Sequence, residues 1–449
     1  MLSKSRVCEY NGDIGINDCR MQANIKMLPE YIYFWYSNLL KSKYFFSSAG
    51  YLGGKFVFFS LFALGSQYLL AHNLSIESYG VIVWANTILS TLGFLSLPGL
   101  SQSLVSAVSK GFLGNYALAF KEKLVFSSLG ALVISGVAGY YFYKGQQQLS
   151  LVMFFSSLFS FGLWMDLQEA FWNGKKEFKK IFLFSSGIKL LQLILLFVTF
   201  KFTSSVVVVF ATQMFLGAFS NLAMSWHIAR SYGANKPYSK EYHDYGKYLS
   251  WLGVLALTAG QVDKWVVKGI AGLNSLAVYA VGQLIYTYFM KVPAGIMASI
   301  FQPRLAGMSV RDAAKWLLVR QPIILFSLTC LVAVVALVLP FVYPVLFSEK
   351  YKGSIYYAYW FLACVAVSGP QMLIGTLLKA HTLKKEMFIS QVLLSVAPFL
   401  AIPFGFLWGL DGVIWSRFVG MLALSVWYLF MVRHLANTNG FPSIRGLAA

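Results

Sequence analysis

Charged side chains are scarce in this chain of 449 residues. Asp, Glu, Lys and Arg together make up 12% of the residues, whereas hydrophobic residues make up 58%. Soluble domains carry roughly 25% charged residues. A larger hydrophobic core cannot account for so low a fraction of charged residues in a chain of this length. Much of the surface must therefore face a nonpolar medium. The composition excludes an ordinary soluble globular protein and predicts a polytopic, all-α membrane protein.

Motifs for nucleotide hydrolysis and common enzyme chemistry are also missing. The stretch GYLGGKF (50–56) resembles part of a phosphate-binding loop, but Ala49 occupies the first glycine position and Phe56 follows the lysine. No H-E-x-x-H, G-x-S-x-G or C-x-x-C sequence occurs, and no soluble domain or long catalytic loop is inserted. We therefore expect no ATP hydrolysis, no cofactor, no metal site and no enzymatic activity.

Cysteine is rare, and its four positions form no recognisable framework. Cys8 and Cys19 lie in a polar N-terminal stretch, and Cys330 and Cys364 lie in apolar segments. This spacing indicates neither a metal site nor a set of disulfides. The two cysteines in apolar segments are expected to pack as small hydrophobic side chains.

Acidic residues are few, with 16 Asp and Glu against 36 Lys and Arg and a net charge of +20. The basic residues cluster in alternate connections between apolar segments, as the positive-inside rule predicts for cytoplasmic loops. The excess therefore indicates topology, with both termini in the cytoplasm, and nucleic-acid binding is not expected. The clusters are Lys110, Lys121 and Lys123; Lys175, Lys176, Lys179 and Lys180; Arg230, Lys236, Lys240 and Lys247; Arg304, Arg311, Lys315 and Arg320; and Lys379, Lys384 and Lys385.

Long apolar runs are abundant, and about twelve have the length that a membrane span requires. A shift of 197 residues aligns the hydropathy of the first two runs with that of the seventh and eighth, which predicts two related bundles of six helices. The expected spans are 48–70, 80–101, 123–143, 149–170, 181–200, 204–227, 248–268, 276–300, 322–346, 355–378, 387–407 and 412–432.

These spans predict four parts of the chain. Residues 1–46 form a cytoplasmic or interfacial segment, for which Met27 is an alternative start. Residues 48–230 and 245–435 form the two bundles, and residues 436–449 form a cytoplasmic tail.

Six charged residues lie inside the predicted spans, where a charge costs at least ~2.5–3.5 kcal/mol. Five are cations and one is a carboxylate, so a cavity lined by them would attract an anion such as phosphate. Each cation has an alternative interpretation, because it can also extend its charged end to the membrane surface or form a structural ion pair. The six are Lys55, Lys189, Lys264, Lys291, Arg417 and Asp263.

Three carboxylates have two interpretations each. Asp263 is a candidate for an ion pair or for a site that binds a coupling proton or sodium ion. Its neighbour Lys264 lies about 100° away around the helix, so the two need not pair. Asp166 and Glu169 close the fourth span and are expected to lie at a solvated helix end, with a shared functional face as the alternative.

Several stretches resemble the polysaccharide and O-antigen flippases of the multidrug/oligosaccharidyl-lipid/polysaccharide exporter superfamily. The longest is YLSWLGVLALTAGQVDKWVVKGIAGLNSLAVYAVGQLIYTYFMKVPAGIMASIFQPRLA (248–306), although the glycine of that family's turn is absent from LAVYAV. Three shorter stretches follow the same order as in the family. They are LSIESYGVIVW (74–84), FWNGKKEFKKIF (171–182) and VLPFVYPVLFSEKYKGS (338–354).

The resemblance, which covers about residues 48–435, implies two six-helix bundles of the MATE type that work by alternating access. It also implies a substrate, a polyprenyl-diphosphate-linked oligosaccharide of O-antigen or capsule, moved across the bacterial inner membrane. In the family, the positions of Lys55, Asp263 and Lys264 tend to carry cavity charges. Membrane lipids and other glycan-assembly proteins are the expected partners.

Two other functions are compatible with parts of this pattern. A drug or solute antiporter of the same fold would be expected to have a cavity rich in carboxylates, which is the opposite of the charge balance seen here. A membrane polysaccharide polymerase or acyltransferase would be expected to have a long outer loop with paired His, Arg or carboxylate residues.

Overall fold

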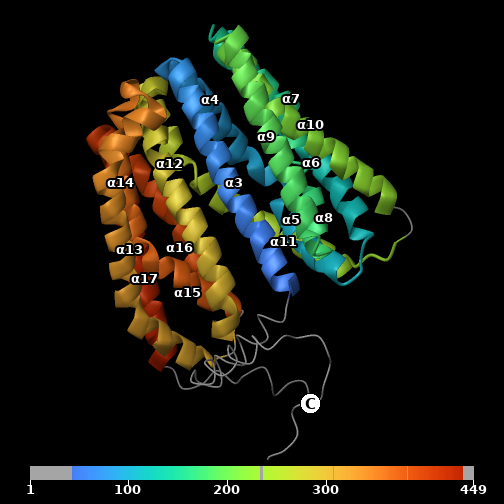
Figure 1. The fold of residues 1–449 in the computed structure, drawn as a ribbon, viewed down its shortest axis with the longest axis vertical. Helices are drawn as coiled ribbons and strands as arrows, with labels where there is room; N and C mark the ends of the chain where they lie inside the picture. The colour runs from blue at the N-terminus through green and yellow to red at the C-terminus, as the bar shows by residue number, and fades with distance from the viewer. Residues whose placement is uncertain (1–42, 233–235, 307, 382, 438–449) are drawn as a thin grey trace, which may run out of the picture. The chain divides into compact units, whose positions relative to one another are not determined.

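The computed structural model describes residues 43–232, 236–306, 308–381 and 383–437, and its regular secondary structure is helical (Figure 1). Contacts divide the chain into residues 1–55 and residues 56–449. The predicted N-terminal segment 1–46 and tail 436–449 lie almost entirely outside the described residues. The predicted boundary between two six-helix bundles remains a prediction of the sequence.

The first half of the chain forms helices that match the first six predicted spans. Two of these spans are interrupted, since α4 is followed by a short 3₁₀ helix and α5, and α7 is followed by α8. The elements are α3 (Lys43–Asn73), α4 (Ile76–Thr91), η1 (Leu92–Ser96), α5 (Pro98–Ser109), α6 (Asn115–Tyr143), α7 (Gln147–Leu163), α8 (Leu167–Gly174), α9 (Phe178–Phe202) and α10 (Val206–Tyr232).

The second half contains longer helices with breaks inside them. The elements are α11 (Lys240–Ala259), α12 (Val262–Ala306), α13 (Val310–Phe347), η2 (Glu349–Tyr351), α14 (Ser354–Val367), α15 (Gly369–Ala380), α16 (Lys384–Val396), η3 (Ala397–Leu400) and α17 (Ala401–Asn437).

Two glycines turn the chain sharply inside α12 and α17. Gly272 has φ 80° and Gly409 has φ 63°, values that glycine adopts without the steric cost of a side chain. The segments on either side run back along each other, because Tyr279 donates to Asp263 across the first turn, and a Cβ at Gly412 would clash with Phe404 across the second. Each of these long helices is therefore a helical hairpin.

Within the described residues, nine helical segments are long and apolar enough to cross a membrane, and a tenth results if the bent pair α14–α15 forms one span. Two of the nine contain the turns at Gly272 and Gly409, so each holds two spans. The architecture therefore agrees with the prediction of about twelve spans in an all-α, multi-pass membrane protein.

The predicted spans differ from the structure in two ways. The predicted second span, 80–101, breaks at Leu97, whose φ of 49° ends the short η1 helix before Pro98 starts α5. Elsewhere, helices extend through basic residues beyond the apolar runs, as α6 does by starting at Asn115. The cation Lys123, expected in a loop, lies inside α6 and is fully buried.

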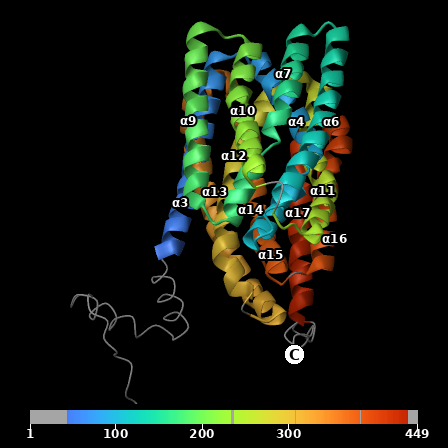
Figure 2. The ribbon, with the colours of Figure 1, turned by 90° about the vertical axis from the view of Figure 1, so that its right-hand side faces the viewer.

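In the first half, consecutive helices pack as the pairs α6–α7 and α9–α10, and the contact of α7 with α10 joins these pairs. Figure 2 shows α9, α10, α7 and α6 standing side by side, and each contacts its neighbour in that row. In the second half, α12 contacts α14, α15 and α17, and α13 contacts α14 and α17 (Figure 1). The most extensive contacts between the halves are those of α5 with α11 and of α4 with α12, and α11 also contacts η1, α4 and α6.

The contact between α4 and α12 is rich in aromatic side chains. The indole of Trp84 donates to the hydroxyl of Tyr141 at 2.8 Å and packs edge-on against Trp265, with ring centroids 4.5 Å apart. The ammonium of Lys268 stands 5.1 Å from the centroid of the Trp84 ring. Just before the start of α4, the carbonyl of Leu74 accepts from Lys350, and burial lowers the pKa of Lys350.

The contact between α5 and α11 depends on close backbone approach. A Cβ at Gly99 would lie 2.3 Å from the carbonyl oxygen of Gly246 and 2.4 Å from the amide nitrogen of Ser250. The Gly99 amide has no acceptor within α5, because it lies in the first turn of the helix, and it donates instead to the hydroxyl of Ser250 at 3.0 Å. Beside this contact, Glu122 on α6 accepts from Lys247 on α11 at 2.7 Å.

We expect Gly99→Ala to destabilise the protein by about 1–3 kcal/mol, since the added methyl group would force α5 and α11 apart. Gly136→Ala on α6 is the matched control, because a Cβ there meets nothing within 4 Å. Thermal unfolding of the purified variants in detergent measures both. An unfolding midpoint of Gly99→Ala equal to that of Gly136→Ala would contradict the close contact.

Candidate functional site

The six predicted site residues lie on four helices: Lys55 on α3, Lys189 on α9, Asp263, Lys264 and Lys291 on α12, and Arg417 on α17. Lys55 belongs to the 1–55 unit, and the side chain of Lys291 lies outside the described residues. Their roles therefore remain predictions of the sequence. The other four can be placed from their contacts.

Asp263 and Arg417 form an ion pair inside the C-terminal helices. Arg417 Nη1 donates to Asp263 Oδ2, and the same oxygen accepts from the hydroxyl of Tyr279 at 2.9 Å and the amide of Gln283 at 3.1 Å. Asp263 Oδ1 accepts from the backbone N–H of Lys264 at 2.9 Å. The carboxylate is 4% exposed, so it is neutralised within the second half of the chain rather than by a lysine of the first half.

The guanidinium of Arg417 is held from several sides. Its central carbon stands 5.0 Å from the ring centroid of Tyr286 and 5.6 Å from that of Phe361, within the range of cation–π attraction. Its Nε atom is buried and has no hydrogen-bond acceptor. The side chain is 19% exposed.

A cavity of about 240 Å³ lies beside this ion pair. Arg417, Asp263 and Tyr286 contribute to its wall, together with Gln391 and Ser395 from α16. Apolar residues, among them Leu394, Pro398, Val413 and Met421, complete the wall. The cavity therefore lies among α11, α12, α16, η3 and α17, all from the second half of the chain.

Lys189 and Lys264 contact other groups. Lys189 Nζ donates to Gln192 Oε1 at 2.9 Å and stands 5.1 Å from the centroid of the Phe62 ring. Lys264 Nζ donates to Gln261 Oε1 at 3.1 Å. Thus Lys189, Lys264 and Arg417 each contact different polar side chains.

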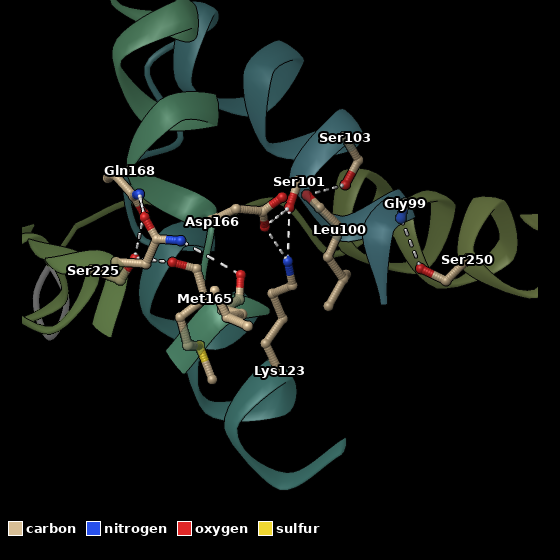
Figure 3. A network of polar contacts seen from close by, with 12 residues as sticks. Gly99, Leu100, Ser101, Ser103, Lys123, Met165, Asp166, Gln168, Ser225 and Ser250 are labelled. Atoms are coloured by element: carbon tan, nitrogen blue, oxygen red, sulfur yellow. Dashed lines mark hydrogen bonds and ion pairs between the residues drawn. The ribbon is translucent and has the colours of Figure 1, made fainter. Parts of the chain in front are cut away.

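A second buried ion pair lies in the first half of the chain and was not predicted. Lys123 Nζ on α6 donates to Asp166 Oδ1 at the break between α7 and α8, and to Ser101 Oγ on α5 at 2.9 Å. Ser101 Oγ also donates to Asp166 Oδ1 at 3.0 Å. Figure 3 shows Lys123 and Ser101 converging on this carboxylate.

The expectation of a simple solvated helix end at Asp166 is therefore wrong in one respect. The carboxylate is 57% exposed, as expected, but it is tied to an ammonium that is 1% exposed. The sequence shows Lys123 at the start of an apolar run, and we assigned this lysine to the preceding loop. The i, i+3 spacing of Asp166 and Glu169 gave no information about Lys123.

Next to this pair, amides and hydroxyls join α8 to α10. Gln168 donates to Asn221 Oδ1 at 2.7 Å, and Ser225 donates to Gln168 Oε1 at 2.7 Å and to the Met165 carbonyl at 3.0 Å (Figure 3). These bonds fix the break between α7 and α8, and with it the position of Asp166. Among the residues that the structure describes, no group of three or more His, Cys, Asp or Glu side chains could hold a metal ion.

The fold is similar to that of solved transporters. One match is an inward-facing multidrug resistance MATE family transporter of the MOP superfamily, with a TM-score of 0.62, 14% identity, and coverage of 85% of this chain and 96% of that one. Another is an outward-facing transporter of the same description, with a TM-score of 0.58, 14% identity, and coverage of 86% and 94%.

A third is a MOP superfamily transporter from Pyrococcus furiosus, whose title reports a binding pocket of reverse polarity. It has a TM-score of 0.57 and 14% identity, and the match covers 86% of this chain and 94% of that one. At this level of identity, the three matches establish the fold.

A search among curated proteins finds no match. The family model described as "Polysaccharide biosynthesis protein" matches residues 69–356. This range contains Lys123, Asp166 and Asp263, and Arg417 lies beyond it. The matched range, 69–356, is more than half of the 449 residues. The solved structures show that the chain has the MATE-type fold of the MOP superfamily transporters. The family match shows that the chain belongs to this family of polysaccharide biosynthesis proteins.

Proposed function

We propose that this protein is a flippase that moves a polyprenyl-diphosphate-linked oligosaccharide from the inner to the outer leaflet of a bacterial inner membrane. The observation that carries the proposal is the match of residues 69–356 to a polysaccharide biosynthesis family in a chain with a transporter fold. The flippases that the sequence resembles imply a glycan unit carried on a lipid diphosphate, so the proposed cargo has a large polar head and a diphosphate. The glycan would be an O-antigen or capsule repeat unit.

The charges support a negatively charged cargo. Inside the predicted spans, five cations stand against one carboxylate, and lysine binds phosphate oxygens as a compact point charge. Lys189 lies within a predicted span, donates to the neutral amide oxygen of Gln192 and stands over the ring of Phe62. In this proposal Lys189 contacts the diphosphate, and Lys55, Lys264 and Lys291 are further candidates.

Alternating access is the mechanism that we propose for the movement. The halves meet mainly through α4 with α12 and α5 with α11, so alternating access would require changes at these contacts. Asp263 is paired with Arg417 and hydrogen-bonded by Tyr279 and Gln283, which favours a structural role over a site for a coupling ion. Removal of the product by the next assembly step would then supply the direction of transport.

The test is transport in proteoliposomes that contain the purified protein and a lipid-linked oligosaccharide extracted from a glycan-producing bacterium. A glycosidase that cannot cross the membrane reports the fraction of substrate in the outer leaflet. We expect the protein to make substrate from both leaflets accessible, whereas protein-free liposomes expose only their outer half. Accessibility equal to that of protein-free liposomes, with correctly folded protein, would refute the proposal.

Two lysines on α9 give a matched pair for the same assay. Lys189→Gln should lower the rate at limiting substrate about tenfold, since a charge-assisted hydrogen bond is worth ~1.5–3 kcal/mol. Lys201→Gln, at the exposed end of the same helix, should leave the rate unchanged. Equal rates for the two variants would remove Lys189 from the diphosphate site.

A further inference from the structure

The cavity beside Arg417 has two buried polar atoms without partners. Arg417 Nε and Ser395 Oγ are both inaccessible and have no hydrogen-bond partner, and both residues line the cavity. An unsatisfied buried polar group costs about 1–3 kcal/mol. Two such groups at one cavity indicate that a ligand with oxygen acceptors completes this wall.

The charge balance of the cavity decides what kind of ligand this is. Arg417 and Asp263 neutralise each other, and Asp263 is only 4% exposed. A phosphate or carboxylate in the cavity would bring a second negative charge close to this carboxylate, at a place with low exposure to water. An uncharged ligand with hydroxyl groups can accept from Arg417 and Ser395 without that cost.

The shape and composition of the wall point the same way. The cavity of about 240 Å³ has room for roughly eight waters at ~30 Å³ each, and it is slightly smaller than typical sites for drug-sized ligands. Tyr286 and Pro398 offer flat apolar surfaces, and Gln391 offers an amide. A single sugar ring combines apolar C–H faces with hydroxyls around its edge, and it fits this wall better than a lipid tail or an ion.

We infer that this cavity is a binding site for one uncharged pyranose unit, with Arg417 and Ser395 as hydrogen-bond donors and Asp263 as the residue that positions Arg417. The inference rests on the proposed function for its biological meaning, since the sugar would belong to the transported glycan. It separates two parts of the substrate: the diphosphate contacts lysines elsewhere, and a sugar ring enters the C-terminal helices. Because both atoms are inaccessible in this structure, the proposed bonds require the Arg417 and Ser395 side chains to turn toward the ligand.

The binding test uses purified protein in detergent with methyl α-D-glucopyranoside, methyl α-D-galactopyranoside and methyl N-acetyl-α-D-glucosaminide as uncharged probes. Sodium glucuronate and inorganic pyrophosphate are the charged probes. Isothermal titration calorimetry measures each affinity. We expect at least one uncharged glycoside to bind more tightly than either anion.

Ser395→Ala is the informative variant, because it removes a hydroxyl that has no partner within the protein and should not destabilise the fold. It should weaken glycoside binding about fivefold, the value of one hydrogen bond. Ser390→Ala is the control, since Ser390 is equally buried on α16 but is not part of the cavity wall. Ala256→Leu, which fills the cavity from α11, should abolish binding.

Three outcomes would overturn the inference: tighter binding of glucuronate or pyrophosphate that is lost in Ala256→Leu, glycoside binding that is unaffected by Ala256→Leu, or no binding of any probe. The first would assign the cavity to an anion, and the last would leave it as a hydrated space. The flipping assay separates this inference from the proposed function. Active flipping without glycoside binding refutes the cavity assignment alone, whereas glycoside binding without flipping refutes the transport function alone.

Discussion

Asp166→Asn is expected to remove most of the folded protein, whereas Lys123→Met at the other end of the same ion pair is expected to be tolerated. The reason is the difference in exposure, because Lys123 is 1% exposed and Asp166 is 57% exposed. Without the negative charge of Asp166, the buried ammonium is left with neutral partners only, the hydroxyl of Ser101 and the amide oxygen of the new Asn side chain. Breaking a buried pair in this way costs about 3–5 kcal/mol.

The converse change leaves the charge where water can reach it. In Lys123→Met, the buried site receives an apolar side chain of similar length, and the exposed Asp166 carboxylate keeps the hydrogen bond from Ser101. We expect the free energy of unfolding to fall by at most about 1 kcal/mol, which is close to the contribution of an exposed ion pair.

The yield of monodisperse protein and its thermal unfolding midpoint measure both variants. The double variant Asp166→Asn with Lys123→Met serves as the control, and it should recover most of the stability that Asp166→Asn loses. Equal losses for the two single variants, or a double variant no better than Asp166→Asn, would contradict the buried ammonium as the cause.

Hydropathy alone predicted most of the fold because a membrane span needs a long apolar run. The predicted runs coincide with the helical segments of the described residues that are long and apolar enough to cross a membrane, and the gap between the predicted spans 387–407 and 412–432 contains the turn at Gly409. The breaks inside spans were not predicted. They depend on backbone conformations at Leu97 and near Trp164, and the composition of an apolar run does not reveal these.

The candidate site was predicted only in part. A charge inside an apolar run is conspicuous, so Asp263 and Arg417 were identified individually. Their pairing was not predictable, since it joins residues 154 positions apart through the packing of α12 against α17. Lys123 was missed because it lies at the edge of an apolar run among other basic residues, where the sequence of a loop and that of a helix start look alike.

The two ion pairs also differ in which partner is buried. In the pair of the first half, the cation is 1% exposed and the carboxylate is 57% exposed. In the pair of the second half, the carboxylate is 4% exposed and the arginine is 19% exposed beside a cavity. The burial of the charge that remains after a substitution should therefore determine how much the free energy of unfolding falls. In the first pair the substitution of the acid should destabilise more, and in the second pair the substitution of the base should destabilise more.

Arg417→Met is accordingly expected to be the more damaging variant of the second pair, with a loss of about 3–5 kcal/mol because it leaves Asp263 ionised in a site that water barely reaches. Asp263→Asn should cost less, about 1.5–3 kcal/mol, the value of a hydrogen bond to a charged group. In that variant, the guanidinium of Arg417 still lies over Tyr286 and Phe361 and can be hydrated from the cavity.

The thermal unfolding midpoints of the two variants and of Asp263→Asn with Arg417→Met test this order. The double variant should recover folded protein, because no buried charge is left, but it should not bind the glycoside probes, because Arg417 no longer donates into the cavity. Tyr279→Phe should cost only about 1 kcal/mol, since Gln283 and Arg417 still bond the carboxylate. A greater loss for Asp263→Asn than for Arg417→Met would show that the arginine, and not the carboxylate, is the charge that this bundle cannot leave unpaired.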